Sequence, residues 1–217
     1  MWPVVLIVMD GVGHNENPEG NAVMAARTPH LDHYHKRYPW SLLEASGEAV
    51  GLPPGFQGSS EVGHLSMGAG RIVEQELQRI NRQLINGSIY QTPEWRRVIA
   101  NWTSNRSQLH FLGLLQDEGV HAHQDHLFKM LRQARKENPA GRIVIHPFLD
   151  GRDTPPRSTL EFWAPLRSVM DEIGGCKIGT FMGRYYGMDR AKNWALTDQA
   201  YRCLVLGEGR KTDHPEA

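Results

Sequence analysis

The chain has only two cysteines among 217 residues, no excess of charge of either sign and no long apolar run. Cys176 and Cys203 lie far apart without metal-motif spacing, which favours a reducing compartment without disulfides. The 24 basic and 24 acidic residues cancel, so the overall charge predicts neither nucleic-acid nor membrane binding. The apolar run at residues 4–9 is too short for a signal peptide or a membrane span. We therefore expect a cytoplasmic protein without nucleic-acid or membrane partners.

The remaining composition is that of a globular protein, with 40% apolar and 22% charged residues. The β-branched and aliphatic run at residues 4–9 predicts a buried strand, and residues 41–45 predict a second one. Thr28 and Pro29 predict a helix start, as cap and first-turn proline, for a helix reaching residue 37. Beyond residue 71 the pattern alternates: helical spacing over 72–85, strands over 109–115, 142–149 and 177–182, and helices over 123–138, 158–173 and 191–206. That order is typical of a parallel α/β sheet.

The first part of the chain is too small to form such a sheet by itself. Two strands and two short helices cannot cover both faces of a parallel sheet, so a boundary is expected near residues 71–76. The sequence also stops just beyond the helix predicted over 191–206, without a closing strand. We therefore expect the chain to be the front part of a longer protein.

Asp10 directly follows the first predicted strand, where parallel sheets gather their ligands. A carboxylate at that position can hold a hard divalent cation such as Mn²⁺ or Mg²⁺. The alternative is an ordinary turn aspartate before Gly11.

Ser60 lies in the glycine-rich stretch GFQGSSEVGHLSMGAGR, just before a predicted helix. Its hydroxyl can face an anion at the helix N-terminus, but it becomes a good nucleophile only with help from a base or a metal. The alternative is that Ser59 or Ser60 caps the helix while Glu61 and His64 are solvated. The GxSxG pattern of acyl-transfer hydrolases is absent.

The stretch GVHAHQDH places His121 before a predicted helix and His123 and His126 at i, i+3 on it. Three readings remain open: a three-histidine zinc site, one imidazole facing an anionic ligand, or the surface start of a helix.

Two further loops, LDGRDTPPR and GRYYGMDR, follow predicted strands and carry Arg152, Asp153, Arg184 and Arg190. A guanidinium binds carboxylate or phosphate in two-pronged fashion, and prolines stiffen the first loop. One such loop alone could contain an internal ion pair, for example between Arg184 and Asp189. Two loops and a histidine at one sheet edge favour a pocket for a small acid.

These stretches, together with VVLIVMDGVG and EGNAVMAARTPHLD, occur in the order and spacing of one enzyme family. The whole chain resembles the cofactor-independent (2,3-bisphosphoglycerate-independent) phosphoglycerate mutases. The resemblance implies an incomplete alkaline-phosphatase-like, metal-binding domain over residues 1–75. It also implies that residues 76–217 form most of an inserted α/β substrate-binding domain with a largely parallel sheet.

The resemblance also assigns residues. Asp10 matches a metal ligand, and Ser60 matches the nucleophile that is also a metal ligand. It implies two Mn²⁺ ions, with Co²⁺ or Mg²⁺ as alternatives, whose other ligands are expected beyond residue 217. It further implies a monomer whose partner is phosphoglycerate. The positions that match substrate-binding residues are His121, Arg152, Asp153, Arg184 and Arg190.

Four positions depart from the family pattern. Ser59 stands where the family usually has asparagine, and Val12 where it has tryptophan. Gln116 and Glu118 replace a serine and a glycine. The change at position 59 is the one that bears on how a transferring phosphate is held, because it directly precedes Ser60.

The implied activity is the interconversion of 3-phosphoglycerate and 2-phosphoglycerate in glycolysis and gluconeogenesis through a phosphoserine. A metal-dependent phosphomonoesterase, or another phosphomutase of the alkaline phosphatase superfamily, is the alternative. Such an enzyme has no reason to carry both FLDGRDTPP and GRYYGMDR. A third reading is that the isolated chain only binds anions.

We predict that residues 1–217 alone, supplied with Mn²⁺, convert no detectable 3-phosphoglycerate, since Asp10 and Ser60 leave a cation mostly hydrated. A coupled assay for 2-phosphoglycerate, with a full-length mutase as positive control, measures this. Clear turnover would show that the chain is complete in function.

Overall fold

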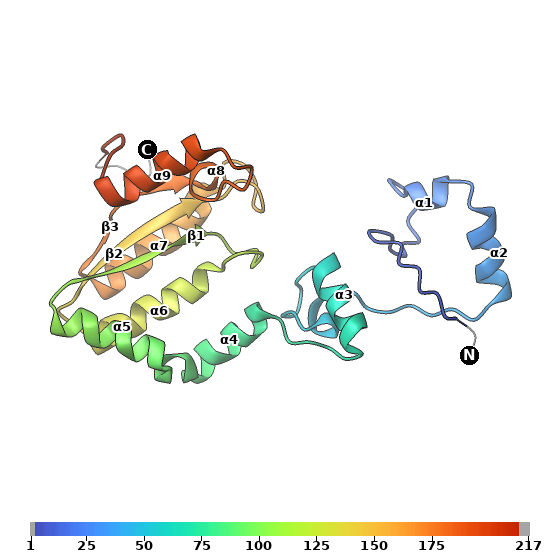
Figure 1. Cartoon of the computed structure of the whole chain (residues 1–217), viewed down its shortest axis with the longest axis horizontal. Helices are drawn as coiled ribbons and strands as arrows, with labels where there is room; N and C mark the ends of the chain where they lie inside the picture. The colour runs from blue at the N-terminus through green and yellow to red at the C-terminus, as the bar shows by residue number, and fades with distance from the viewer. Residues whose placement is uncertain (1–2, 213–217) are drawn as a thin grey trace. The chain divides into compact units, whose positions relative to one another are not determined.

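The computed structural model describes residues 3–212, which form two compact units that divide between Gln78 and Arg79 (Figure 1). The domain boundary expected between residues 75 and 76 remains a prediction. Between residues 3 and 212, none of the helices combines the length and apolar character that a membrane crossing requires.

The first unit contains short helices joined by long irregular segments. These helices are α1 (Ala22–Ala25), α2 (Pro29–Arg37), the 3₁₀ turn η1 (Gly47–Val50), α3 (Ser60–Ala69) and the start of α4 (Glu76–Asn86). The helix expected over 28–37 is α2, with Pro29 in its first turn as predicted. Thr28 does not cap the backbone; its hydroxyl instead donates to the Asp32 carboxylate over 3.0 Å.

The strands expected at residues 4–9 and 41–45 are absent, so these two predictions are wrong. Both segments contain no assigned strand, and Val4 and Leu43 are 95% and 89% exposed. A strand needs a neighbour to satisfy its backbone hydrogen bonds. No such neighbour exists among residues 3–78, so apolar sequence alone does not produce a sheet here.

The second unit is an α/β structure with a parallel sheet, which confirms the predicted fold class. After α4, its elements are η2 (Ser88–Gln91), α5 (Pro93–Ser104), β1 (Gln108–Leu115), α6 (Gln124–Glu137), β2 (Arg142–Leu149), α7 (Thr159–Ile173), β3 (Cys176–Ile178), β4 (Met182–Gly183), α8 (Arg184–Gly187) and α9 (Trp194–Leu206). Strand β2 is central: it pairs in parallel with β1 along its whole length, with β3 at its start and with β4 at its end.

Several details differ from the prediction for this unit, among them helix α8 within the stretch GRYYGMDR, which was expected as a loop. The single strand expected over 177–182 is split into β3 and β4, which pair with different parts of β2. Helix α5 was not predicted, although Thr92 and Pro93 mark its start: the Thr92 hydroxyl accepts a hydrogen bond from the Trp95 amide, and Pro93 occupies the first turn.

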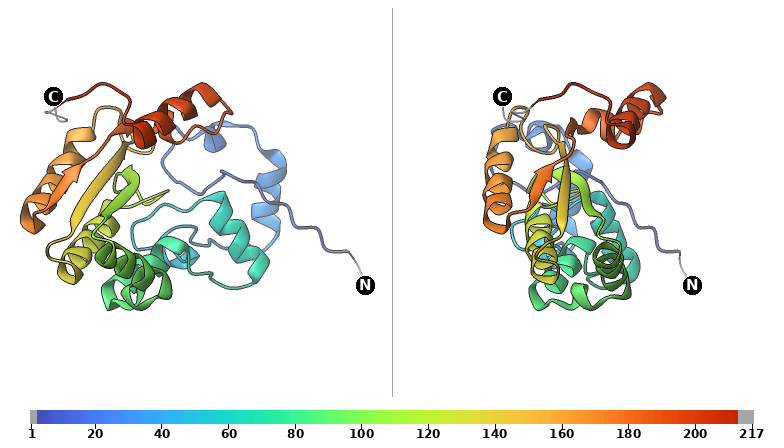
Figure 2. Two further views of the ribbon diagram at one scale, coloured as in Figure 1. Left: turned by 60° about the vertical axis from the view of Figure 1, so that its left-hand side comes forward. Right: turned by 90° about the vertical axis from the view of Figure 1, so that its left-hand side faces the viewer.

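Alternate residues of β2 point to opposite faces of the sheet. Ile143 and Ile145, each 1% exposed, belong to the main core together with side chains of α5, α6 and α7. Val144 and His146 lie on the other face. Figure 2 shows α7 and α9 on opposite sides of the strands. The buried face fixes the strands, and hence the loops that follow their carboxyl ends.

Leu166, fully buried on α7, tests this core. We predict that Leu166→Ala lowers the free energy of unfolding by about 2–5 kcal/mol, because it leaves a cavity in a close-packed region. Urea denaturation followed by circular dichroism measures the change. Leu160→Ala on the same helix, where the side chain is 59% exposed, serves as control and should cost less than about 1 kcal/mol. Equal losses would show that α7 does not pack as described.

Candidate functional site

Two of the predicted site residues meet in the first unit. The Ser60 hydroxyl donates a hydrogen bond to Asp10 Oδ2 over 2.7 Å, although the two residues are 50 positions apart in the chain. Both residues are exposed. The contact joins the predicted nucleophile to the predicted metal ligand; their chemical roles remain predictions.

The structure does not support the alternative in which these serines merely cap a helix. Ser59 is the N-cap residue of α3, but its side chain makes no capping hydrogen bond. Ser60 is the first residue of α3, and its hydroxyl is directed to Asp10. The backbone at Gly58 passes so close to the backbone at Ala45 that a Cβ at position 58 would overlap the Ala45 carbonyl oxygen. Only glycine fits there without a shift of the chain.

His64, which the capping alternative left merely solvated, is exposed and contacts the same serine. Its Nδ1 lies 2.8 Å from the Ser60 carbonyl oxygen and 3.2 Å from the Ser60 hydroxyl oxygen. Since a carbonyl only accepts hydrogen bonds, Nδ1 carries a proton that it donates to the Ser60 carbonyl oxygen. The i, i+4 spacing on α3 was the available signal for this contact.

Asp10 and Ser60 provide two oxygen donors of the kind that hard divalent cations prefer. Among residues 3–212, no group of three or more His, Cys, Asp or Glu side chains is arranged to hold a metal ion. The first unit therefore supplies two of the oxygen ligands that a cation site needs, but not a complete set among the described residues. The same observation gives no support to a three-histidine zinc site at His121, His123 and His126.

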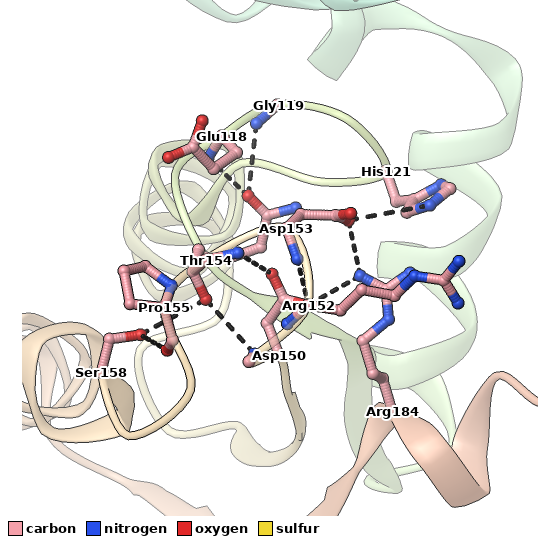
Figure 3. Close-up of polar contacts among 12 residues, drawn as sticks. Glu118, Gly119, His121, Asp150, Arg152, Asp153, Thr154, Pro155, Ser158 and Arg184 are labelled. Carbon is pink, nitrogen blue, oxygen red and sulfur yellow. Dashed lines mark hydrogen bonds and ion pairs between the residues drawn. The ribbon is translucent and has the colours of Figure 1, made fainter. Parts of the chain in front are cut away.

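The second cluster lies at the carboxyl ends of β2 and β4, as predicted for a parallel sheet (Figure 3). Arg184 Nη1 donates to Asp150 Oδ1 over 2.6 Å and to Asp153 Oδ2 over 2.5 Å. Arg184 therefore forms its ion pairs with Asp150 and Asp153, and not with Asp189 as the alternative had it. Asp189 instead accepts hydrogen bonds from the backbone amides of Ala191 and Asn193.

His121 completes this cluster. Its Nε2 lies 3.8 Å from Asp153 Oδ2, and its side chain is 40% exposed (Figure 3). The spacing had indicated that the neighbouring His123 lies on the helix, but in the structure it lies just before the helix. It is the N-cap residue of α6, and its Nδ1 accepts a hydrogen bond from the Asp125 amide.

Arg152 and Arg190 have exposed side chains. Within residues 3–212 neither guanidinium has a hydrogen bond or an ion pair. Exposed, uncompensated cations near a strand end are suited to bind an anion. The structure thus brings together His121, Asp153 and Arg184, and leaves Arg152 and Arg190 available.

A cavity of about 220 Å³ lies beside His121. Apolar side chains line most of it, and the titratable residues in its wall are His121, His123, His126 and His146. Burial lowers the pKa of His126, and electrostatic interactions with His123 and Lys129 lower it further against a weaker opposite effect from Asp125. Burial also lowers the pKa of His146, with repulsion from His110 as the second cause.

Besides His64, sequence reasoning missed two supporting residues in the second unit. Asp150 holds Arg184, and its signal was an aspartate before glycine in LDGRDTPPR. Gln116, fully buried, accepts hydrogen bonds from the amides of Glu118 and Gly119 and so shapes the loop before His121. No sequence pattern marked Gln116, because it departs from the family motif at that position.

The chain matches known proteins over nearly its whole length. The family model described as BPG-independent PGAM N-terminus matches residues 80–217. A 2,3-bisphosphoglycerate-independent phosphoglycerate mutase 1 of Methanosarcina barkeri is 48% identical over 94% of the chain. A 2,3-bisphosphoglycerate-independent phosphoglycerate mutase of Clostridium novyi is 45% identical over 99%. The chain spans 40% and 42% of the lengths of these relatives.

A solved structure is also similar. It comes from a study titled as crystal structures of Leishmania mexicana phosphoglycerate mutase at low cobalt concentration. It matches with a TM-score of 0.78 and 34% sequence identity, over 94% of this chain and 38% of that one.

The pKa values of His126 and His146 lead to a prediction about pH. Both are lowered by folding, so the unfolded chain binds protons more readily than the folded one. Stability is therefore expected to be full above the unfolded value of about 6.5 and to fall as the pH decreases below it. Urea titrations at pH 7.5 and pH 5.5 measure the difference.

His146→Gln should reduce this pH dependence, because it removes one of the two titrating groups. His30→Gln, at an exposed position on α2, is the matched control and should leave the dependence as it is. An unchanged slope in His146→Gln would contradict the assignment to His146.

Proposed function

We propose, because this chain belongs to the BPG-independent phosphoglycerate mutase N-terminus family, that it supplies the nucleophile and part of the substrate site of such a mutase. The enzyme would interconvert 3-phosphoglycerate and 2-phosphoglycerate through a phosphoserine at Ser60. Residues 1–75 would contribute to the phosphotransfer domain and residues 76–217 to the inserted substrate-binding domain. It would act as a cytoplasmic monomer.

The observation that carries this proposal is the 2.7 Å hydrogen bond from Ser60 to Asp10. A serine hydroxyl is a weak nucleophile unless a base or a cation favours loss of its proton. Here the proton already faces a carboxylate. The nucleophile also lies at the N-terminus of α3, where backbone N–H groups and the helix dipole favour a transferred phosphoryl group.

Asp10 and Ser60 would hold one divalent cation, Mn²⁺ with Co²⁺ or Mg²⁺ as alternatives, through their side-chain oxygens. When bound, such a cation stabilises the deprotonated hydroxyl and screens the negative charge of the phosphate. The second ion that the resemblance implies would rely on ligands other than Asp10 and Ser60.

The second unit would hold the three-carbon acid. Arg184 keeps N–H donors beyond the Nη1 it shares with Asp150 and Asp153, and Arg152 and Arg190 have uncompensated charges. These guanidinium groups suit the carboxylate of glycerate. Asp153, 18% exposed and facing His121, suits a hydroxyl group as hydrogen-bond acceptor.

The proposed chemistry consists of two balanced transfers. In the first, Ser60 Oγ loses its proton and attacks phosphorus, and the bond from phosphorus to the C3 oxygen breaks with return of a proton to that oxygen. In the second, the 2-hydroxyl of the retained glycerate loses its proton, attacks the phosphoserine and regenerates Ser60. Arginines that keep glycerate from leaving prevent hydrolysis, which would give glycerate and inorganic phosphate instead.

A chimera tests this proposal: residues 1–217 joined to the part of the Methanosarcina barkeri relative that lies beyond the matched region. We expect it to form 2-phosphoglycerate from 3-phosphoglycerate in the presence of Mn²⁺. Ser60→Ala should lower the rate by about a thousandfold or more and abolish phosphoserine, because the nucleophile is lost. Ser104→Ala is the matched control, since it removes an exposed serine hydroxyl at the end of α5 to which no catalytic role is assigned.

Product analysis by ³¹P NMR distinguishes the outcomes. Inorganic phosphate without 2-phosphoglycerate would favour a metal-dependent phosphomonoesterase. Near-normal rates in Ser60→Ala would contradict the nucleophile assignment.

A further inference from the structure

Asp150 is the most enclosed acidic side chain at the end of β2. Its carboxylate is 1% exposed, whereas the neighbouring Asp153 is 18% exposed. Oδ1 accepts hydrogen bonds from Arg184 Nη1 over 2.6 Å and from the amides of Arg152 and Asp153 over 3.3 and 3.4 Å. Oδ2 accepts one from the Thr154 amide over 3.0 Å.

A buried carboxylate is tolerated only when charge and hydrogen bonds replace its lost hydration. Burial alone raises the pKa of Asp150. The hydrogen bonds from Arg184 and from three consecutive backbone amides outweigh that effect, and the pKa of Asp150 lies below its usual value. The group is therefore ionised at neutral pH and keeps its four donors.

The loop around Asp150 has further internal support. The Thr154 hydroxyl accepts a hydrogen bond from the Gly151 amide, and Gly151 has a positive φ of 83° that favours glycine. Ser158 donates to the Pro155 carbonyl over 2.8 Å, at the start of α7 (Figure 3). These contacts connect the loop to α7, which packs in the core. Within the loop, the Asp150 carboxylate accepts the hydrogen bonds of three consecutive backbone amides.

We infer that Asp150 is a positioning residue for the substrate site: it sets the orientation of Arg184 and of the backbone that carries Arg152 and Asp153. This inference rests on the proposed function, in which those three residues contact the acid. Asp150 itself is too enclosed to touch a ligand. It acts by fixing one guanidinium nitrogen, so that the other N–H groups of Arg184 point in one direction.

The charges support a division of roles between the two aspartates. Arg184 has one positive charge and faces two carboxylates. Asp150 is enclosed and stays paired with Arg184. Asp153 is more exposed, so a ligand can take the place of one of its partners, Arg184 or His121. Without the negative charge at position 150, Arg184 would pair with Asp153 alone and withdraw it from a ligand hydroxyl.

The first test needs no ligand and uses the 217-residue chain. Hydrogen exchange measured by NMR should show slow amides at Arg152, Asp153 and Thr154 in the parent. In Asp150→Asn, which keeps the shape and loses the charge, these amides and the Arg184 side-chain N–H should exchange at least about tenfold faster, because charge-assisted hydrogen bonds are lost. Core amides of β2 in the same spectra show whether the variant is folded.

The second test titrates 3-phosphoglycerate into the same proteins. Asp150→Asn should weaken binding by about tenfold to a hundredfold, since misplaced contacts lose most of their value. Glu172→Gln is the matched control: it removes a carboxylate from an exposed ion pair with Arg132 and should leave affinity unchanged. Thr154→Val removes the acceptor for the Gly151 amide and the Ser158 hydroxyl but leaves the Asp150 carboxylate in place. It should have a smaller effect and serves if Asp150→Asn does not fold.

The outcomes separate the two proposals. If the parent binds 3-phosphoglycerate and Asp150→Asn binds it equally well, or if local exchange is unchanged, the positioning role is wrong while the proposed function stands. If the parent binds no 3-phosphoglycerate at all, the substrate assignment for these residues is wrong, and with it the positioning role. Faster local exchange together with weakened binding supports the inference.

Discussion

The charged cluster of the second unit depends on one guanidinium that is shared by two carboxylates. Arg184 follows β4, and Asp150 and Asp153 follow β2, so their contact ties together the ends of two neighbouring strands. The strands are in turn fixed by a core in which Ile143 and Ile145 pack under α5, α6 and α7. Core packing therefore determines where the charged groups lie, and the ion pairs determine how they point.

Sequence patterns predicted the second unit well, because each of its strands and helices has a partner within the chain. Helix α7 and strand β2 occur almost where apolar periodicity indicated. The apolar residues 4–9 failed as a strand because a ladder needs a neighbour, and periodicity does not say whether one is present. The fold prediction succeeded where local pattern and long-range pairing agree.

For the candidate site, too, some residues could be predicted from the sequence and others could not. Motifs pointed to Asp10, Ser60 and Arg184 by residue type, and the structure places each of them in a hydrogen-bonded cluster, while their chemical roles stay predictions. They did not identify His64 or Asp150, since these residues act through hydrogen bonds whose geometry appears only in the folded chain. Supporting residues are set by distance and burial, and neither quantity can be read from a list of amino acids.

The tight passage at Gly58 limits how this protein can change over evolutionary time. Any side chain there must push away the carbonyl oxygen of Ala45. Gly58 stands two residues before Ser60, so the shift would be passed on to the hydroxyl that donates to Asp10. Mutational drift in this loop is therefore restricted by a steric condition on a residue that does no chemistry, and descendants should keep glycine there as long as the serine is used.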